Sequence, residues 1–279
     1  AFLKPVGKPG VLITSRRCLA VQRFTGAHEL GHFFMEHEPN VDGEDILTGN
    51  SGKPDVEVQA NSFAAEFLAP QWLLELHARR QGWGYDHVRD PRFVYQLSLR
   101  VGTSYEATCR RLQHRKIVER HETERLLAVA PKTIKQDLVK QFAPNFTPTN
   151  WYPDIWWLTE KDQGCRMEGS PDDLFIFTLN ERTGSGYLWD METLGKEGFS
   201  LVNDKRVPTA EAKKAGASMI RQTAACSNDR HSGQLSLHHR RPWLGDTSSF
   251  EQLSLPYELM GSESGMPRAV RRKWEARAA

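Results

Sequence analysis

The sequence predicts an α+β protein whose helices come first and whose strands come last. Up to about Leu127, apolar residues recur three and four positions apart, as in helices that bury one face. After Trp151, short apolar and aromatic runs are separated by Gly, Asn and Asp, which is typical of strands joined by turns. These two patterns indicate a mainly helical N-terminal half and a C-terminal β-sandwich.

Length and composition exclude several classes of protein. The 279 residues suffice for two domains, and 37 basic against 35 acidic residues give a net charge of +2. Such a small net charge gives no strong overall attraction to nucleic acid or to an acidic membrane. Every apolar run is far shorter than the ~18 residues of a membrane span. The four cysteines include no CxxC pair, which argues against a zinc ribbon or a disulfide scaffold and favours free thiols in the cytoplasm.

The N-terminal pattern predicts two helices separated by a loop. The helical pattern of apolar residues begins near Phe24. A second stretch with this pattern ends at Pro70. The expected elements are a strand at 10–14, a helix at 24–37 with Thr25 as N-cap, a loop at 38–55 and a helix at 56–68.

The rest of the chain divides into a helical, a connecting and a strand-rich part. Residues 91–127 are expected to be helical, with an interruption at 102–104 that resembles a helix-turn-helix. Four prolines between residues 131 and 153 predict a connector. The expected core face of the helices comprises Val94, Leu97, Leu99 and Leu112. Strands are expected at 174–179, 199–202 and 234–238, and a polar tail follows residue 260.

The pentapeptide HELGH at residues 28–32 is the strongest chemical signal. Spacing of four residues on a helix puts His28 and His32 on one face, so both imidazoles can bind one metal ion. Glu29 adjoins the first ligand, where a carboxylate can take a proton from water and pass it to a leaving amine. This pattern predicts metal-assisted hydrolysis of a peptide bond.

A catalytic zinc needs a third protein ligand, and the second helix offers candidates. Glu57 and Asn61 are four residues apart and share a face. Glu66 lies nine residues beyond Glu57, or half a turn away at 100° per residue, so both glutamates cannot face the metal. Glu57 is therefore the candidate ligand, and Asn61 could hold the far nitrogen of a ligand histidine. The alternative for Glu57 is a solvated acidic residue at a helix N-terminus.

Two segments, RFTGAHELGH at 23–32 and EVQANSFAAEFLAP at 57–70, closely resemble the ImmA/IrrE metallopeptidase family. The resemblance implies a gluzincin-like fold in which His28, His32 and Glu57 bind zinc, with manganese as the alternative metal, and Glu29 is the general base. It also implies a protein substrate, a helix-turn-helix repressor or an antitoxin, and a role in transcription regulation or stress response.

The segment from Phe93 to Val118 resembles the helices that follow the peptidase core in this family. Residues 79–125 carry eleven Lys and Arg against six Asp and Glu. A basic helix-turn-helix could bind DNA phosphates, for which Arg100, Arg110 and Arg111 are the candidates. The alternative, which we favour, is a packing module with a solvated basic face.

The segments GSGYLW at 184–189 and GQLSLHHRRPW at 233–243 resemble the chagasin family, immunoglobulin-like inhibitors of papain-like cysteine peptidases. The resemblance implies that loops with Tyr and Trp enter a peptidase cleft. The candidate binding residues are Gly186, Tyr187, Trp189, Arg241, Pro242 and Trp243. Either tryptophan could instead belong to the core of the sandwich.

These resemblances predict a zinc endopeptidase joined to a binding or sensing module. The expected parts are a peptidase core at 1–78, a helical extension at 79–130, a linker at 131–150, a chagasin-like sandwich at 151–260 and a tail at 261–279. The alternatives are a non-catalytic inhibitor of a cysteine peptidase and a DNA-binding regulator. His77 and Tyr85 are candidates for oxyanion stabilisation, although each is more typical of a structural role.

Overall fold

The computed structural model describes residues 2–3, 10–11, 13–14, 17–37, 55–209, 218–227, 229, 231–244 and 249–260. The loop expected at 38–55, apart from its last residue, and the tail expected at 261–279 lie outside these residues. None of the helices in the described ranges is long and apolar enough to cross a membrane.

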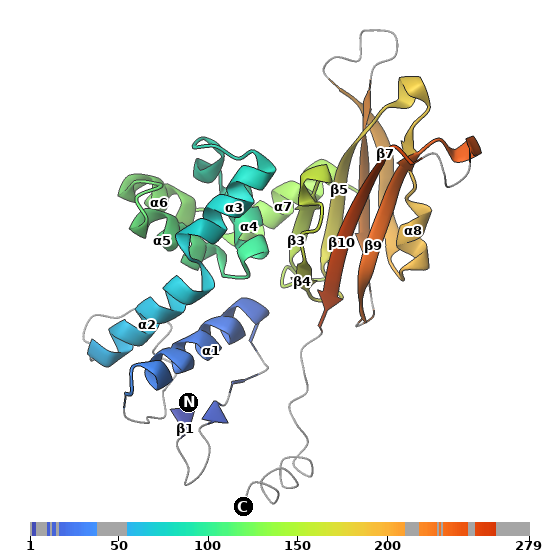
Figure 1. The fold of residues 1–279 in the computed structure, drawn as a ribbon. Helices are drawn as coiled ribbons and strands as arrows, with labels where there is room; N and C mark the ends of the chain where they lie inside the picture. The colour runs from blue at the N-terminus through green and yellow to red at the C-terminus, as the bar shows by residue number, and fades with distance from the viewer. Residues whose placement is uncertain are drawn as a thin grey trace, which may run out of the picture.

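The N-terminal half is helical and lies beside a strand-rich C-terminal half (Figure 1). A short antiparallel pair, β1 (Phe2–Leu3) and β2 (Gly10–Val11), precedes the helices. The helices are α1 (Leu19–Phe34), α2 (Asp55–Leu68), α3 (Gln71–Gln81), α4 (Pro91–Val101), α5 (Tyr105–His114), α6 (Arg120–Leu127) and α7 (Pro131–Phe142). The predicted order of helices before strands is confirmed, and Val94, Leu97 and Leu112 are buried as expected, with Leu99 half-buried.

Two predictions about the first helix are wrong. Helix α1 begins at Leu19, five residues before the predicted start, and its N-cap is Cys18. Thr25 therefore lies in the helix interior rather than at its cap. The preceding segment LAVQR contains good helix formers, so the helix extends past the local capping preference of threonine.

The predicted connector at 131–153 is also wrong in its first half, which forms helix α7. Pro131 occupies the first helical turn, where its missing N–H breaks no hydrogen bond. Ile134, Leu138 and Phe142 follow at helical spacing and are buried. Proline therefore starts an element here instead of interrupting one.

The C-terminal half is a sandwich of two four-stranded sheets, with orders β3-β5-β8-β7 and β4-β10-β9-β6. Phe175 and Phe177 from one sheet and Leu235 and Leu255 from the other share one buried core, which confirms the predicted sandwich. The strands are β3 (Ile155–Leu158), β4 (Met167–Gly169), β5 (Leu174–Glu181), β6 (Leu188–Trp189), β7 (Ser200–Pro208), β8 (Met219–Cys226), β9 (His231–Arg240) and β10 (Glu251–Leu259), with helix α8 (Glu192–Lys196) between β6 and β7.

Strand β5 is buried on both faces because the helices cover the outer face of its sheet (Figure 1). Leu174 and Ile176 belong to the helical core, whereas Phe175 and Phe177 belong to the sandwich core. The uninterrupted apolar run of β5 is typical of a strand covered on both sides. The two halves therefore share a packed boundary, and residues 131–150 do not form a simple linker.

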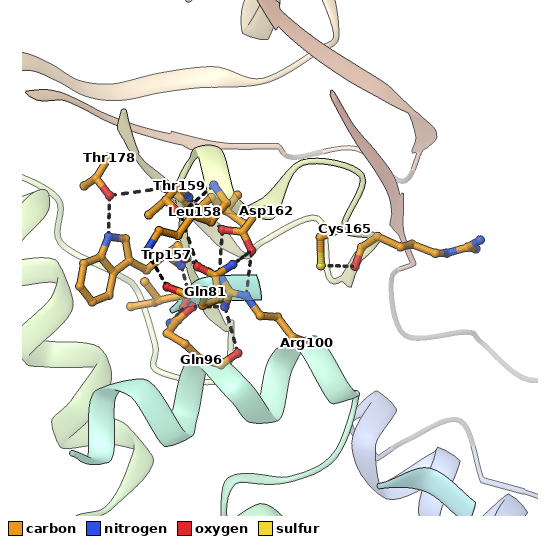
Figure 2. Close-up of polar contacts among 12 residues, drawn as sticks. Gln81, Gln96, Arg100, Trp157, Leu158, Thr159, Asp162, Cys165 and Thr178 are labelled. Atoms are coloured by element: carbon orange, nitrogen blue, oxygen red, sulfur yellow. Dashed lines mark hydrogen bonds and ion pairs between the residues drawn. The ribbon is translucent and has the colours of Figure 1, made fainter. Parts of the chain in front are cut away.

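A buried ion pair crosses this boundary (Figure 2). Arg100 of α4 donates to both carboxylate oxygens of Asp162, from Nε at 2.9 Å and from Nη2 at 3.0 Å. Their side chains are 1% and 0% exposed. Arg100 also donates to the carbonyl oxygens of Gln96 and Trp157, and Gln81 donates to Asp162 at 2.6 Å. This network fixes α3 and α4 against the start of the sandwich.

Candidate metal centre and recognition loops

Helix α1 places His28, Glu29 and His32 in a buried position against α2. Their exposed fractions are 3%, 2% and 5%. The two helices approach closely at Gly31, where an added Cβ would lie 3.1 Å from Cα of Ala60. This close approach brings Glu57 of α2, which is 8% exposed, opposite the two histidines.

The three predicted ligands converge on one point. Nε2 of His28 lies 3.0 Å from Nε2 of His32. Glu57 lies 3.3 Å from His28 through Oε2 and 3.4 Å from His32 through Oε1. Two ligands at zinc-bond length on a tetrahedral ion are about 3.3 Å apart. The spacing of His28, His32 and Glu57 thus fits one zinc ion, and these residues form a candidate metal cluster.

The outer nitrogens of both histidines are held by neighbouring side chains. Nδ1 of His28 donates to Oδ1 of Asn61 at 3.1 Å, as the sequence predicted for Asn61. His32 contacts Nδ1 of His37 through its own Nδ1 at 2.9 Å, and Nε2 of His37 donates to Gln59 at 3.2 Å. Metal binding through Nε2 requires the proton of each ring on Nδ1, and these contacts give the Nδ1 atoms of His28 and His32 a hydrogen-bond partner.

Sequence reasoning missed His37 and Gln59. His37 lies beyond the end of α1, and Glu36 turns the chain back with a left-handed φ of 57°. The backbone N–H of His37 then donates to the carbonyl of His32 at 3.0 Å. The position of His37, five residues after a ligand histidine, could have suggested a role at this site. Its contact with His32, however, depends on the turn at Glu36.

Glu66 faces away from the cluster, as its spacing predicted. Its carboxylate pairs with Arg111 and Arg115. The hydrogen bond from Arg111 lowers the pKa of the Glu66 carboxyl below its ordinary value. Of the two glutamates of α2, Glu57 therefore faces the histidines, whereas Glu66 pairs with the arginines.

The prediction that three arginines could contact DNA is wrong for two of them. Arg100 is buried in its pair with Asp162, and the Arg111 side chain is 5% exposed in its pair with Glu66. Only Arg110 lies at the surface, where it pairs with Glu106. The favoured packing role of these helices agrees with these contacts.

His77 and Tyr85, the suggested oxyanion stabilisers, differ in their surroundings. The Tyr85 hydroxyl donates to Glu122 at 3.4 Å, and Arg89 stacks over its ring. His77 is 9% exposed on α3. Burial lowers the pKa of His77 to about 4, and the positive charge of Arg100 adds to this effect. Tyr85 is therefore held by Glu122 and Arg89, and His77 is buried on α3.

Buried His77 is expected to make folding less stable in acid. Below its ordinary pKa of 6.5 the unfolded chain takes up a proton that the folded chain binds only near pH 4. Stability is therefore lost as the pH falls from 6.5 to 4, by about 3 kcal/mol at 1.36 kcal/mol per pKa unit. Urea unfolding of wild type and His77→Phe at pH 7 and pH 4.5 measures this loss. The variant should lose less, whereas the exposed control His121→Phe should follow wild type, and parallel losses in all three proteins would refute the assignment.

Two loops at one end of the sandwich form a joint surface. Gly186 has a φ of 76°, and a Cβ there would overlap the ring of Trp243. Arg241 lies 4.7 Å over the ring of Tyr187 and donates to the carbonyl of Ser185 at 3.0 Å. The loops at 184–187 and 241–244 thus pack on each other.

The two tryptophans of these segments have different surroundings. Trp243 is 67% exposed and follows exposed Pro242 in a short 3-10 turn. Trp189 is 3% exposed and stacks on His239, with ring centroids 4.8 Å apart. Trp189 therefore belongs to the core, and Trp243 is the available aromatic anchor.

Comparisons with known proteins match each half separately. Residues 2–113 match the family model of the IrrE N-terminal-like domain, peptidase M78, and residues 170–255 match that of the chagasin family peptidase inhibitor I42. The comparison with curated proteins found no match.

Two solved structures are similar to part of the chain. The cysteine protease inhibitor EhICP2 from Entamoeba histolytica is 21% identical with a TM-score of 0.35, and covers 39% of this chain and 98% of its own. Amebosin is 18% identical with a TM-score of 0.32, and covers 39% of this chain and 99% of its own. On the family matches, the chain combines an IrrE N-terminal-like peptidase M78 domain at residues 2–113 with a chagasin family domain at residues 170–255.

Proposed function

We propose that this protein is a zinc-dependent endopeptidase with His28, His32 and Glu57 as metal ligands and Glu29 as the general base. The convergence of three ligand atoms at 3.0–3.4 Å, matching tetrahedral zinc, carries the proposal. The match to a peptidase family supports it. Manganese prefers octahedral oxygen ligands, so two imidazoles and one carboxylate favour zinc.

Each residue of the site has a distinct role in this proposal. Zinc, when bound, would polarise the scissile carbonyl and make water more acidic. Glu29 would accept the proton from the attacking water and pass it to the leaving amine. Asn61 and His37 would orient the two imidazoles, so that each Nε2 faces the ion.

A library of internally quenched fluorogenic peptides tests the activity without knowledge of the natural substrate. We expect the zinc-loaded full chain to cleave a subset of these peptides. Removal of zinc with 1,10-phenanthroline should stop cleavage, and added zinc should restore it. Cleavage that continues at the same rate in the chelator would contradict a zinc peptidase.

The natural substrate in this proposal is a helix-turn-helix repressor or an antitoxin, and the site of action is the cytoplasm. The sequence resemblance to ImmA/IrrE peptidases supports this choice. Repressors and antitoxins from the same cell can be mixed singly with the zinc-loaded protein and followed by mass spectrometry. Cleavage of one of them at a single bond is expected, and intact masses for all of them would contradict the substrate class.

Asn61→Ala is expected to weaken zinc binding by about 10- to 100-fold, because the His28 ring loses the group that orients it. Competition with a fluorescent zinc chelator measures this affinity. Ser62→Ala on the same helix is the control, since Ser62 is exposed and its hydroxyl donates to the Val58 carbonyl. Equal affinities of both variants would contradict the role of Asn61.

A second candidate function is binding of a papain-like cysteine peptidase by the sandwich. The exposed Trp243, packed on Gly186 beside Tyr187, supports it together with the chagasin family match. Titration of papain with the full chain should give saturable inhibition, and Trp243→Ala should raise the inhibition constant at least ~30-fold, as for an aromatic hot spot. Trp72→Ala is the matched control, because Trp72 is 65% exposed on α3. No inhibition by high micromolar protein would remove this candidate for papain.

A further inference from the structure

A cavity of about 460 Å³, half open to solvent, lies at the boundary of the helical half and the sandwich. Its walls come from α3, α4 and α7 on one side and from β3, β5 and β8 on the other. Figure 2 shows part of this boundary, where Trp157 donates to Thr178 and Thr159 donates to Gln81. Ligand pockets of ~300–1,000 Å³ occur preferentially at such domain boundaries.

Aromatic rings form a continuous wall of this cavity. Phe93 lies 5.4 Å from Trp83 and 5.6 Å from Trp157, between ring centroids. Phe142 continues the row at 5.3 Å from Trp157. The indole N–H of Trp157 is already bonded to Thr178 at 2.7 Å (Figure 2), so its ring offers the cavity only an apolar surface. Neighbouring rings of the row are tilted by 40° to 72°, so a flat ligand would stack on the face of one ring and lie against the edge of the next.

Three side-chain amides line the same cavity from three different elements. They are Gln141 on α7, Asn180 on β5 and Gln222 on β8. Gln141 and Asn180 are exposed and Gln222 is half-buried, and within the described part of the chain none of these amide groups makes a hydrogen bond to another residue. Each offers one donor and one acceptor side by side, the pattern that pairs with the edge of a purine base.

The charged groups at the cavity are balanced and already anchored. Lys161 donates to the carbonyl of Gln81 at 2.7 Å, and Glu160 accepts from the backbone N–H of Asn180. One positive and one negative charge leave no net charge for an anionic group. The cavity therefore favours an uncharged ligand over a phosphorylated one.

We propose that this cavity binds an uncharged purine nucleoside, with the base against Phe93 and Trp157 and its polar edge on the amides of Gln141 and Gln222. Such a ligand would touch both halves of the protein. The ligand would stabilise the boundary between the two halves. The cavity lies outside the HELGH site. The proposal is independent of peptide hydrolysis and of cysteine peptidase binding.

Calorimetric titration of the full chain with adenosine tests the proposal. We expect saturable one-to-one binding and a higher melting temperature with ligand, because adenosine would bind the folded state. Gln222→Ala and Gln141→Ala should each weaken binding at least tenfold. Gln252→Ala is the control, since this exposed glutamine lies on β10 in the other sheet. Circular dichroism of each variant shows whether it is folded.

Each other outcome would overturn the proposal. Absence of binding at millimolar adenosine and guanosine would exclude a purine site. Equal binding by wild type and both glutamine variants would place the ligand elsewhere. Much tighter binding of adenosine monophosphate would contradict the uncharged ligand, and binding of N-acetylglucosamine without binding of adenosine would assign the cavity to a sugar.

Discussion

Replacement of Glu29 by glutamine is expected to lower kcat for peptide hydrolysis by about 10³-fold, within the ~10²–10⁴ range of general acid–base catalysis. Glutamine preserves the size of the side chain but cannot accept a proton. Because Glu29 is not among the proposed ligands, zinc binding should be retained. Initial rates on the best fluorogenic peptide, together with zinc content, measure both effects.

The matched control for this variant is Glu75→Gln. Glu75 lies on α3, and its carboxylate accepts from Gln71 and Arg79 on the same helix. We expect wild-type rates for the control. Glu29→Gln protein that binds zinc and still cleaves at the wild-type rate would refute the role of Glu29 and leave the metal site standing.

Replacement of Arg100 by methionine is expected to destabilise folding by about 3–5 kcal/mol, the cost of removing one partner of a buried ion pair. Asp162 would keep its charge at 0% exposure and lose its bidentate partner. Since the pair joins the two halves, the loss should weaken their boundary. Urea unfolding, followed by tryptophan fluorescence and by circular dichroism, measures the effect.

A second substitution separates charge from packing at Arg100. In Arg100→Met protein, Asp162→Asn removes the uncompensated charge and should recover part of the stability. Arg110→Met is the surface control, and loss of its exposed pair with Glu106 should cost below ~1 kcal/mol. Equal losses for the Arg100 and Arg110 variants would contradict the assigned role of the network.

The sequence predicted best where one local pattern has one structural meaning. Helix geometry alone puts His28 with His32 on one face and Glu57 with Asn61 on another, and the close packing of α1 on α2 then brings the two faces together. The apolar run at 174–179 likewise predicts a strand, but not that helices cover the outer face of its sheet.

Sequence patterns failed where distant partners decide the outcome. In the sequence, Arg100 resembles a surface residue of a basic helix. In the structure, its ion pair with Asp162, 62 positions later, holds it in the interior. Pro131 is compatible with a connector or a helix start, and packing of Ile134 and Leu138 in the core selects the helix. Thr25 has a cap-like sequence, but α1 continues through it. Such choices depend on tertiary contacts that single-sequence patterns do not contain.

The most direct test of the account is the metal content of protein purified without a histidine tag. Mass spectrometric metal analysis should find about one zinc per chain in wild type and in Glu66→Ala, whose glutamate pairs with Arg111 and Arg115. Glu57→Ala should lose the zinc, because two imidazoles alone do not complete the site. Wild-type protein that takes up no zinc even after reconstitution, or Glu57→Ala protein that keeps it as tightly as wild type, would contradict the three-ligand metal centre.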